Sequence, residues 1–79
     1  MRVFFHYRSP DKDVWTATEL DMAQVPVVGE YVTIHANSPW YKVQIVVHTP
    51  FEGSRTACEI FAVKTDQATE QRRAMPDFP

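Results

Sequence analysis

Residues 40–48 constrain the fold more than any other segment, because apolar and polar side chains alternate along them. The apolar set consists of Tyr41, Val43, Ile45 and Val47. The opposite set consists of Trp40, Lys42, Gln44, Val46 and His48. A period of two residues is typical of a β-strand that buries one face. The segment therefore predicts a long, half-buried strand.

The same period predicts further strands over residues 2–8, 14–20, 31–35 and 56–65. In the first of them, one side is expected to carry Val3, Phe5 and Tyr7, and the other Arg2, Phe4, His6 and Arg8. The last strand has apolar residues on both sides, with Cys58, Ile60 and Ala62 opposed by Ala57, Phe61 and Val63. Apolar residues on both sides are typical of a central strand.

Turn-forming residues separate these strands. Residues 9–13 contain a proline between polar residues, and Gly29 precedes the third strand, where it can adopt a positive φ. Residues 21–25 run into Pro26 and are expected to form a loop. Residues 49–55 form a longer loop with an exposed ring at Phe51.

A chain of 79 residues has room for one domain. We assign residues 1–65 to a single small β-domain and residues 66–79 to a C-terminal segment that is either a short helix capped by Asp66 or a flexible tail. The fold class is mostly β. The strands are expected to form a five-stranded antiparallel sheet, as a small SH3-like barrel that hides its edges or as a curled sheet.

Charge and cysteine content limit the partners and the compartment. The net charge of −2 and the lack of a basic patch disfavour nucleic-acid binding. One cysteine cannot form an internal disulfide, and there is no apolar run of membrane-spanning length, so we expect a cytoplasmic protein that does not bind a membrane.

No catalytic or metal-binding motif is recognisable. His6, His35 and His48 would have to converge across strands to bind a metal, and none has the close spacing of a zinc ligand set. Cys58 lies in the predicted central strand, where burial makes a thiol unreactive. With two glycines, the chain has no phosphate-binding loop. We therefore expect no enzyme, no catalytic or metal-binding residues and no cofactor.

The segment Pro26-Val27-Val28-Gly29-Glu30-Tyr31-Val32, followed by the alternating segment that starts at Trp40, carries a resemblance. A proline, then Gly-Glu-x-Val, then an aromatic-led strand resembles short SH3-like small-barrel proteins of bacteria and their phages. The resemblance covers about half of the chain and assigns no functional residue. It implies a binding role, including that of a phage-borne inhibitor of a host defence system.

Rings and cations on the expected polar side of the sheet and at one loop tip are the candidate binding residues. They are Arg2, Phe4, His6, Arg8, Tyr31, Trp40, Lys42, His48 and Phe51. Such a surface suits a protein partner anchored by aromatic side chains and arginine, which makes a non-catalytic interaction module the leading hypothesis.

Two other interpretations remain open for these residues. The same rings and cations suit a small anionic ring ligand, such as a cyclic nucleotide, held between subunits of a homo-oligomer. Phe4 and Trp40 could instead close the end of a barrel or lie in a contact between subunits. A small enzyme or a nucleic-acid-binding protein is the remaining alternative.

Overall fold

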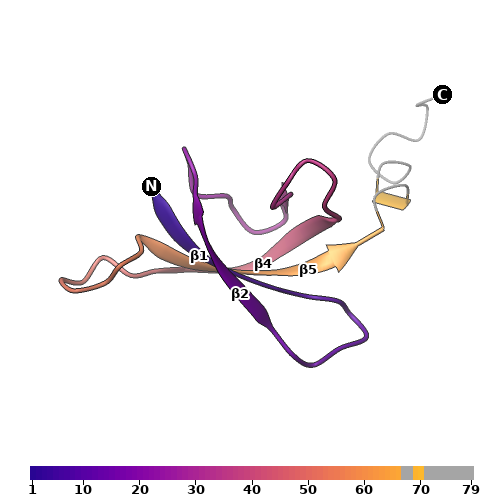
Figure 1. The fold of residues 1–79 in the computed structure, drawn as a ribbon, viewed down its shortest axis with the longest axis horizontal. Helices are drawn as coiled ribbons and strands as arrows, with labels where there is room; N and C mark the ends of the chain where they lie inside the picture. The colour runs from indigo at the N-terminus through magenta and orange to yellow at the C-terminus, as the bar shows by residue number, and fades with distance from the viewer. Residues whose placement is uncertain (67–68, 71–79) are drawn as a thin grey trace.

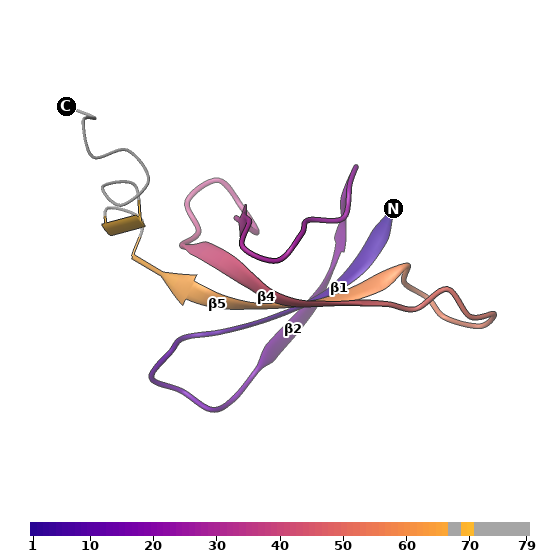
Figure 2. The same ribbon diagram turned by 180° about the vertical axis from the view of Figure 1, so that it is seen from behind.

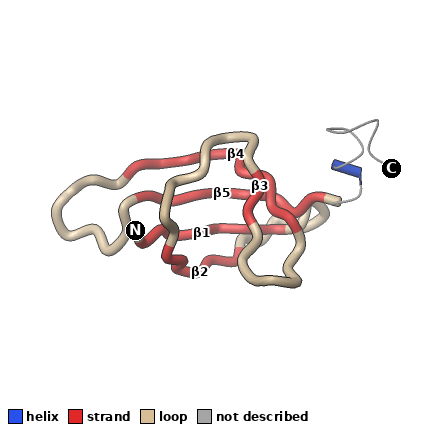
Figure 3. Tube along the Cα trace, turned by 90° about the horizontal axis from the view of Figure 1, so that it is seen from above, coloured by secondary structure: helices blue, strands red, loops and turns tan. Residues whose placement is uncertain are grey.

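The computed structural model describes residues 1–66 and 69–70, which contain five strands in one sheet (Figure 1). The strands are β1 (Arg2–Arg8), β2 (Thr16–Asp21), β3 (Tyr31–Val32), β4 (Trp40–His48) and β5 (Cys58–Thr65). Their order across the sheet is β2-β1-β5-β4-β3, with β5 in the centre (Figure 3). The mostly-β class and the central position of β5 are confirmed.

The sheet is mixed, and the expectation of an antiparallel sheet is wrong at its centre. β1 and β5 pair in parallel, whereas β1–β2, β3–β4 and β4–β5 are antiparallel. The β1–β2 hairpin and the β3–β4–β5 meander are separate local units. The connection after β2 determines which strand of the meander lies beside β1 and in which direction it runs. Side-chain alternation carries no information about that choice.

The sheet curls into a half-barrel around a small core. The buried apolar residues are Val3, Phe5, Val32, Tyr41, Val43, Cys58, Ile60 and Ala62. The connection from β2 to β3 lies on this side of the sheet, as Figures 1 and 2 show, and Met22, Val25 and Ile34 pack against the core. β2 and β3 are the two ends of the strand order, so the sheet is open and the alternative of a closed barrel is wrong.

Two hydrogen-bonded turns flank β3. Gly29 has the expected positive φ, 95°, and its N–H donates to the carbonyl of Val43 at 2.9 Å. After Val32, the N–H of Ile34 donates to Ser38 Oγ at 3.0 Å, and the N–H of Ser38 donates to the carbonyl of His35 at 3.1 Å. The two bonds after Val32 turn the chain away from β4, which is why β3 ends before the predicted strand does.

A bulge in β4 changes which side chains face the core. The bounds of β4 are those predicted, but the register with β5 shifts between Val43 and Ile45, so that Gln44 is an extra residue. An extra residue reverses the alternation beyond it. Ile45 and Val47 are consequently 53% and 42% exposed, and Val46 packs against the core. The prediction that Ile45 and Val47 are buried is wrong.

Asp66, which follows β5, is hydrogen-bonded to both Thr69 and Glu70. The N–H of Glu70 donates to the carbonyl of Asp66 at 2.9 Å, and Thr69 Oγ1 donates to its carboxylate at 3.0 Å. The described residues contain no complete helix, and the rest of the predicted segment 66–79 lies outside them. Among the described residues there is no helix with the length and hydrophobicity needed to cross a membrane.

Candidate binding surface

The side of the sheet opposite the core carries a continuous set of rings, aliphatic groups and charges, which we call the outer face. Strand register brings them into rows, for example Phe4 beside Glu59 and His6 beside Phe61. The outer face consists of Arg2, Phe4, His6, Arg8, Trp15, Ala17, Glu19, Asp21, Tyr31, Trp40, Lys42, Ile45, Val47, Glu59, Phe61, Val63 and Thr65.

Four rings in the middle of the outer face contact one another, and we call them the ring cluster: Phe4, His6, Phe61 and Trp15. The imidazole of His6 stacks on Phe61 with centroids 4.3 Å apart and lies 4.6 Å from Phe4. Trp15 meets Phe61 edge-on at 5.5 Å. The guanidinium of Arg8 lies 5.1 Å from the centre of the Trp15 ring, within cation–π range.

Much of this apolar surface is exposed. Trp15 is 40% exposed, and Ile45 and Val47 in β4 are exposed still further, while Phe4, His6 and Phe61 are half-buried. Single exposed apolar residues are ordinary, whereas a contiguous group of them is a feature that calls for an explanation. The ring cluster and the neighbouring aliphatic residues of β4 form such a group.

The carboxylates of the outer face are paired. Glu19 accepts a hydrogen bond from Arg2 at 3.2 Å and forms an ion pair with Arg55 at 3.1 Å. Glu59 is 2.9 Å from Nε2 of His6, whose side chain is 15% exposed. The contact with Glu59 and the stacking on Phe61 fix the position of the His6 ring.

The cations of this surface outnumber its carboxylates. Arg2, Arg8, Lys42 and the adjoining Arg55 are four cations against the three carboxylates of Glu19, Asp21 and Glu59, although the whole chain has a net charge of −2. Asp21 is itself paired with the N-terminal ammonium group at 3.0 Å. Arg8 donates to the carbonyls of Ser9 and Lys12 at 3.2 and 3.0 Å, which holds it over Trp15. The outer face and its border therefore carry more cations than carboxylates.

A second pair of rings extends the outer face toward β3. Tyr31 and Trp40 have centroids 5.6 Å apart, and the ammonium group of Lys42 lies 5.9 Å from the Tyr31 ring centre. The Tyr31 hydroxyl donates to Glu70 at 2.5 Å. This pair lies on the same side of the sheet as Arg8, because Lys42 is beside Val63 and Val63 beside Arg8.

Seven of the nine predicted binding residues lie on the outer face: Arg2, Phe4, His6, Arg8, Tyr31, Trp40 and Lys42. His48 does not, because the bulge in β4 places it opposite Cys58, on the core side of the sheet. Phe51 is 64% exposed, as predicted, but it lies in the loop between β4 and β5. The structure thus places seven of the predicted residues on one surface and the other two elsewhere.

Sequence reasoning missed Trp15, Phe61, Ile45 and Val47 as members of this surface. Trp15 and Phe61 are far apart in the chain and meet only because β1 separates β2 from β5. Alternation alone assigned Ile45 and Val47 to the core. Only the apolar character of both sides of β5 pointed to Phe61, since it indicated a second surface with apolar residues.

The histidines do not converge. His6 faces outward, His48 lies on the core side, and His35 is in the turn before Ser38. Within residues 1–66 and 69–70 no three His, Cys, Asp or Glu side chains are grouped as metal ligands would be. Cys58 is fully buried, as predicted, and this burial raises the pKa of its thiol, which disfavours the reactive thiolate.

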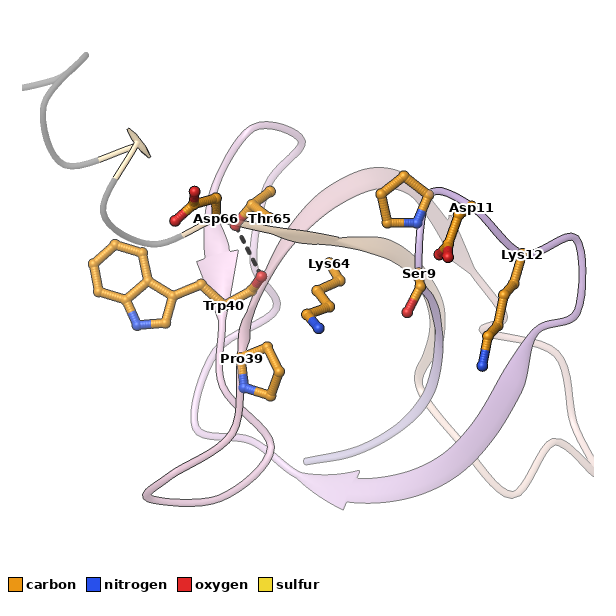
Figure 4. Close-up of a pocket in the computed structure, with 9 residues that line it drawn as sticks. Ser9, Asp11, Lys12, Pro39, Trp40, Lys64, Thr65 and Asp66 are labelled. Atoms are coloured by element: carbon orange, nitrogen blue, oxygen red, sulfur yellow. Dashed lines mark hydrogen bonds between the residues drawn. The ribbon is translucent and has the colours of Figure 1, made fainter.

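A shallow depression lies at the end of the sheet where β1 and β5 finish and β4 starts (Figure 4). It has a volume of about 700 Å³ and is lined by Ser9, Pro10, Asp11, Lys12, Pro39, Trp40, Lys64, Thr65 and Asp66. The hydroxyl of Thr65 donates to the carbonyl of Trp40 at 2.9 Å, which ties β5 to β4 along its wall. The Lys64 side chain extends across its middle.

Comparison with family models, with curated proteins and with solved structures finds no match for this chain.

Proposed function

We propose that this protein is a non-catalytic interaction module that binds another protein through its outer face. The observation that carries the proposal is the exposed ring cluster with Arg8 over Trp15. Tryptophan, tyrosine and arginine are the residues on which the binding energy of protein interfaces most often depends. The outer face offers all three, with aliphatic residues beside them and charged residues around them.

The shape and charge of the outer face favour a protein over a small ligand. Its residues extend across five strands, from Glu19 in β2 to Tyr31 in β3, whereas small-molecule sites are concave and enclose most of the ligand. The excess of cations would select a partner with an acidic surface, because complementary potentials steer association.

The finer parts of the proposal depend on the sequence. The resemblance to short SH3-like small-barrel proteins supports an inhibitor, carried by a phage, that occupies a component of a host defence system. The lone Cys58 supports action in the reducing cytoplasm.

Removing two rings of the ring cluster is expected to weaken partner binding strongly. Phe4→Ala combined with Trp15→Ala should weaken affinity about a hundredfold, the loss typical of a hot-spot residue at an interface. The partner would be captured on the immobilised full-length chain from a lysate of the source organism, identified by mass spectrometry and titrated by calorimetry. Circular dichroism would verify that the double variant is folded.

Phe51→Ala is the control for this experiment. It removes an exposed ring from a loop outside the outer face, so affinity for the partner should stay within about twofold of the unaltered chain. Equal affinity of the double variant and the control would contradict the proposal, and so would binding that Phe51→Ala alone removes.

The depression in Figure 4 favours a second candidate function, the sequestration of a small nucleotide. Its volume of about 700 Å³ is suited to such a ligand. Lys12 and Lys64 provide cations for phosphate and Trp40 provides a ring. Asp11 and Asp66 also line it and would oppose an anion. For this reason it ranks second, and a pocket shared between subunits would be needed to enclose the ligand.

Nucleotide binding depends on the two lysines under this second proposal. Lys12→Glu combined with Lys64→Glu should remove any binding detected when a panel of cyclic and linear nucleotides is titrated by calorimetry, because it places carboxylates where phosphate would lie. Native mass spectrometry of the protein from its natural host should show a retained ligand. Protein that is isolated without a bound ligand and binds no nucleotide of the panel would contradict this function.

A further inference from the structure

The second half of β4 is a free edge of the sheet. β3 pairs only with Tyr41 and Lys42, and the turn at Gly29 adds two hydrogen bonds to Val43. From there to His48, β4 pairs with β5 on one side and, in the described part of the chain, with no strand on the other. The chain that precedes this turn packs on the core side of the sheet, where Val25 contacts the core.

The backbone of this edge presents unpaired hydrogen-bonding groups. The N–H of Thr49 donates to the carbonyl of Ala57, beyond the end of β5, at 3.0 Å. Because successive residues of a strand point their N–H and C=O groups to alternate sides, Val47 points toward β5, and Val46 and His48 point toward the free side. No hydrogen bond to these groups of Val46 and His48 is formed within residues 1–66 and 69–70.

The two edges of the sheet differ in how they are protected. β2 carries the carboxylates of Glu19 and Asp21 and three polar or small residues along its edge, and charges on an edge strand prevent further strands from adding. The free part of β4, Gln44 to His48, contains no Lys, Arg, Asp, Glu or Pro. Its three central residues are β-branched and suited to strand pairing.

Exposed valines flank the free edge on the core side. Val27 and Val28 are 63% and 62% exposed. Together with Val25, Pro26, Val46 and His48 they line an apolar hollow of about 240 Å³. A side chain of an added strand that points to the core side would enter this hollow and cover the valines.

The sequence of the edge is complementary to itself. In an antiparallel pairing centred on Val46, Ile45 lies opposite Val47 of the partner subunit, and Gln44 lies opposite His48 of the partner subunit. The two central valines exchange their free N–H and C=O groups. No like charges meet. We propose that a second copy of this chain adds to the free edge in this register, so that a two-fold symmetric dimer forms one continuous sheet.

Charge substitutions at the paired positions test both the dimer and its register. Gln44 and His48 are both exposed. Gln44→Lys with His48→Lys sets lysine against lysine at two places, whereas Gln44→Glu with His48→Lys sets glutamate against lysine. In analytical ultracentrifugation of the full-length chain, the dimer dissociation constant of the second variant should be about tenfold lower than that of the first.

Amide hydrogen exchange identifies the surface that the dimer uses. The amides of Val46 and His48 should exchange more slowly when the protein concentration is raised above the dissociation constant, and those on the free edge of β2 should not change. A dimer formed through the outer face would leave all of these amides unaffected and would overturn the proposal. A chain that remains monomeric, or two charge variants with equal dissociation constants, would also overturn it.

This inference concerns the edge of the sheet and does not rest on the proposed function. Phe4 and Trp15, which the binding test removes, lie in and next to the other half of the sheet. A monomeric protein could still bind its partner through the ring cluster, and a dimer could fail to do so.

Discussion

Phe5→Ala is expected to leave this protein unfolded at room temperature. The Phe5 side chain is fully buried and packs against two tyrosines, with ring centroids 5.9 Å from Tyr7 and 6.1 Å from Tyr41. Truncating a buried phenylalanine costs about 3–5 kcal/mol. The core of a chain this short supplies a net stability of only about 3–5 kcal/mol. The loss therefore equals the whole free energy of unfolding.

Phe4→Ala is the matched control, since it removes the same side chain from the neighbouring residue on the opposite side of β1. Phe4 is half-buried, and we expect a loss of about 1 kcal/mol. Far-UV circular dichroism and urea titration of both variants would measure the difference. Losses of equal size would mean that β1 does not separate a core side from an outer face.

The local elements of the fold could be predicted because each depends on a short stretch of sequence. The alternation in β1 placed Phe5 in the core and His6 outside, and both are confirmed. Gly29 has the positive φ that its position before a strand suggested. In β5 the apolar residues on both sides correctly indicated a strand with a neighbour on each side.

The arrangement of the strands could not be predicted in the same way. The parallel pairing of β1 with β5 joins residues more than fifty positions apart, such as Val3 and Cys58. Nothing in either strand specifies its neighbour, because alternation identifies the buried side of a strand and not the strand beside it. The contact between Trp15 and Phe61 depends on this arrangement, so the sequence identified only Phe4 and His6 of the ring cluster.

The candidate binding residues were identified from residue type, and most of them proved to share a surface. They did so because Arg2, Phe4, His6 and Arg8 occupy one side of a single strand, β1, whose alternation is regular. The residues that were assigned to the wrong side lie beyond the bulge in β4, where the two-residue alternation of side chains is reversed. A bulge adds one residue without a distinctive sequence signal, and Gln44 is an ordinary strand residue in composition.

The outer face and the free edge of β4 would act together if both proposals hold. Pairing of two copies along β4 would place the outer faces of both subunits on one continuous sheet, since side chains keep to their own side of a strand. Two ring clusters would then be available to one partner or to two linked partners. Linked sites bind more tightly than either site alone, because the second contact becomes intramolecular.

Val46→Asp is expected to unfold this protein, whereas Ile45→Asp is expected to be tolerated. Val46 is half-buried and packs against the core, and a carboxylate there would lose part of its hydration and its apolar contacts, at a cost of about 3 kcal/mol, which is comparable with the whole stability of a chain this short. Ile45 is 53% exposed on the outer face, so its replacement should cost about 1 kcal/mol, mostly through the poor strand propensity of aspartate. Both free energies of unfolding would be measured by urea titration at low protein concentration, where association contributes nothing.

The two aspartate variants separate the bulged strand from a regular one. A regular alternation over residues 40–48 would bury Ile45 with Tyr41 and Val43 and expose Val46, and the order of the two variants would then be reversed. Val43→Asp, which lies before the bulge and is 1% exposed, should unfold the protein in either case and serves as the positive control. The order of Ile45→Asp and Val46→Asp therefore tests whether Gln44 is the extra residue, and with it whether Ile45 and Val47 belong to the outer face.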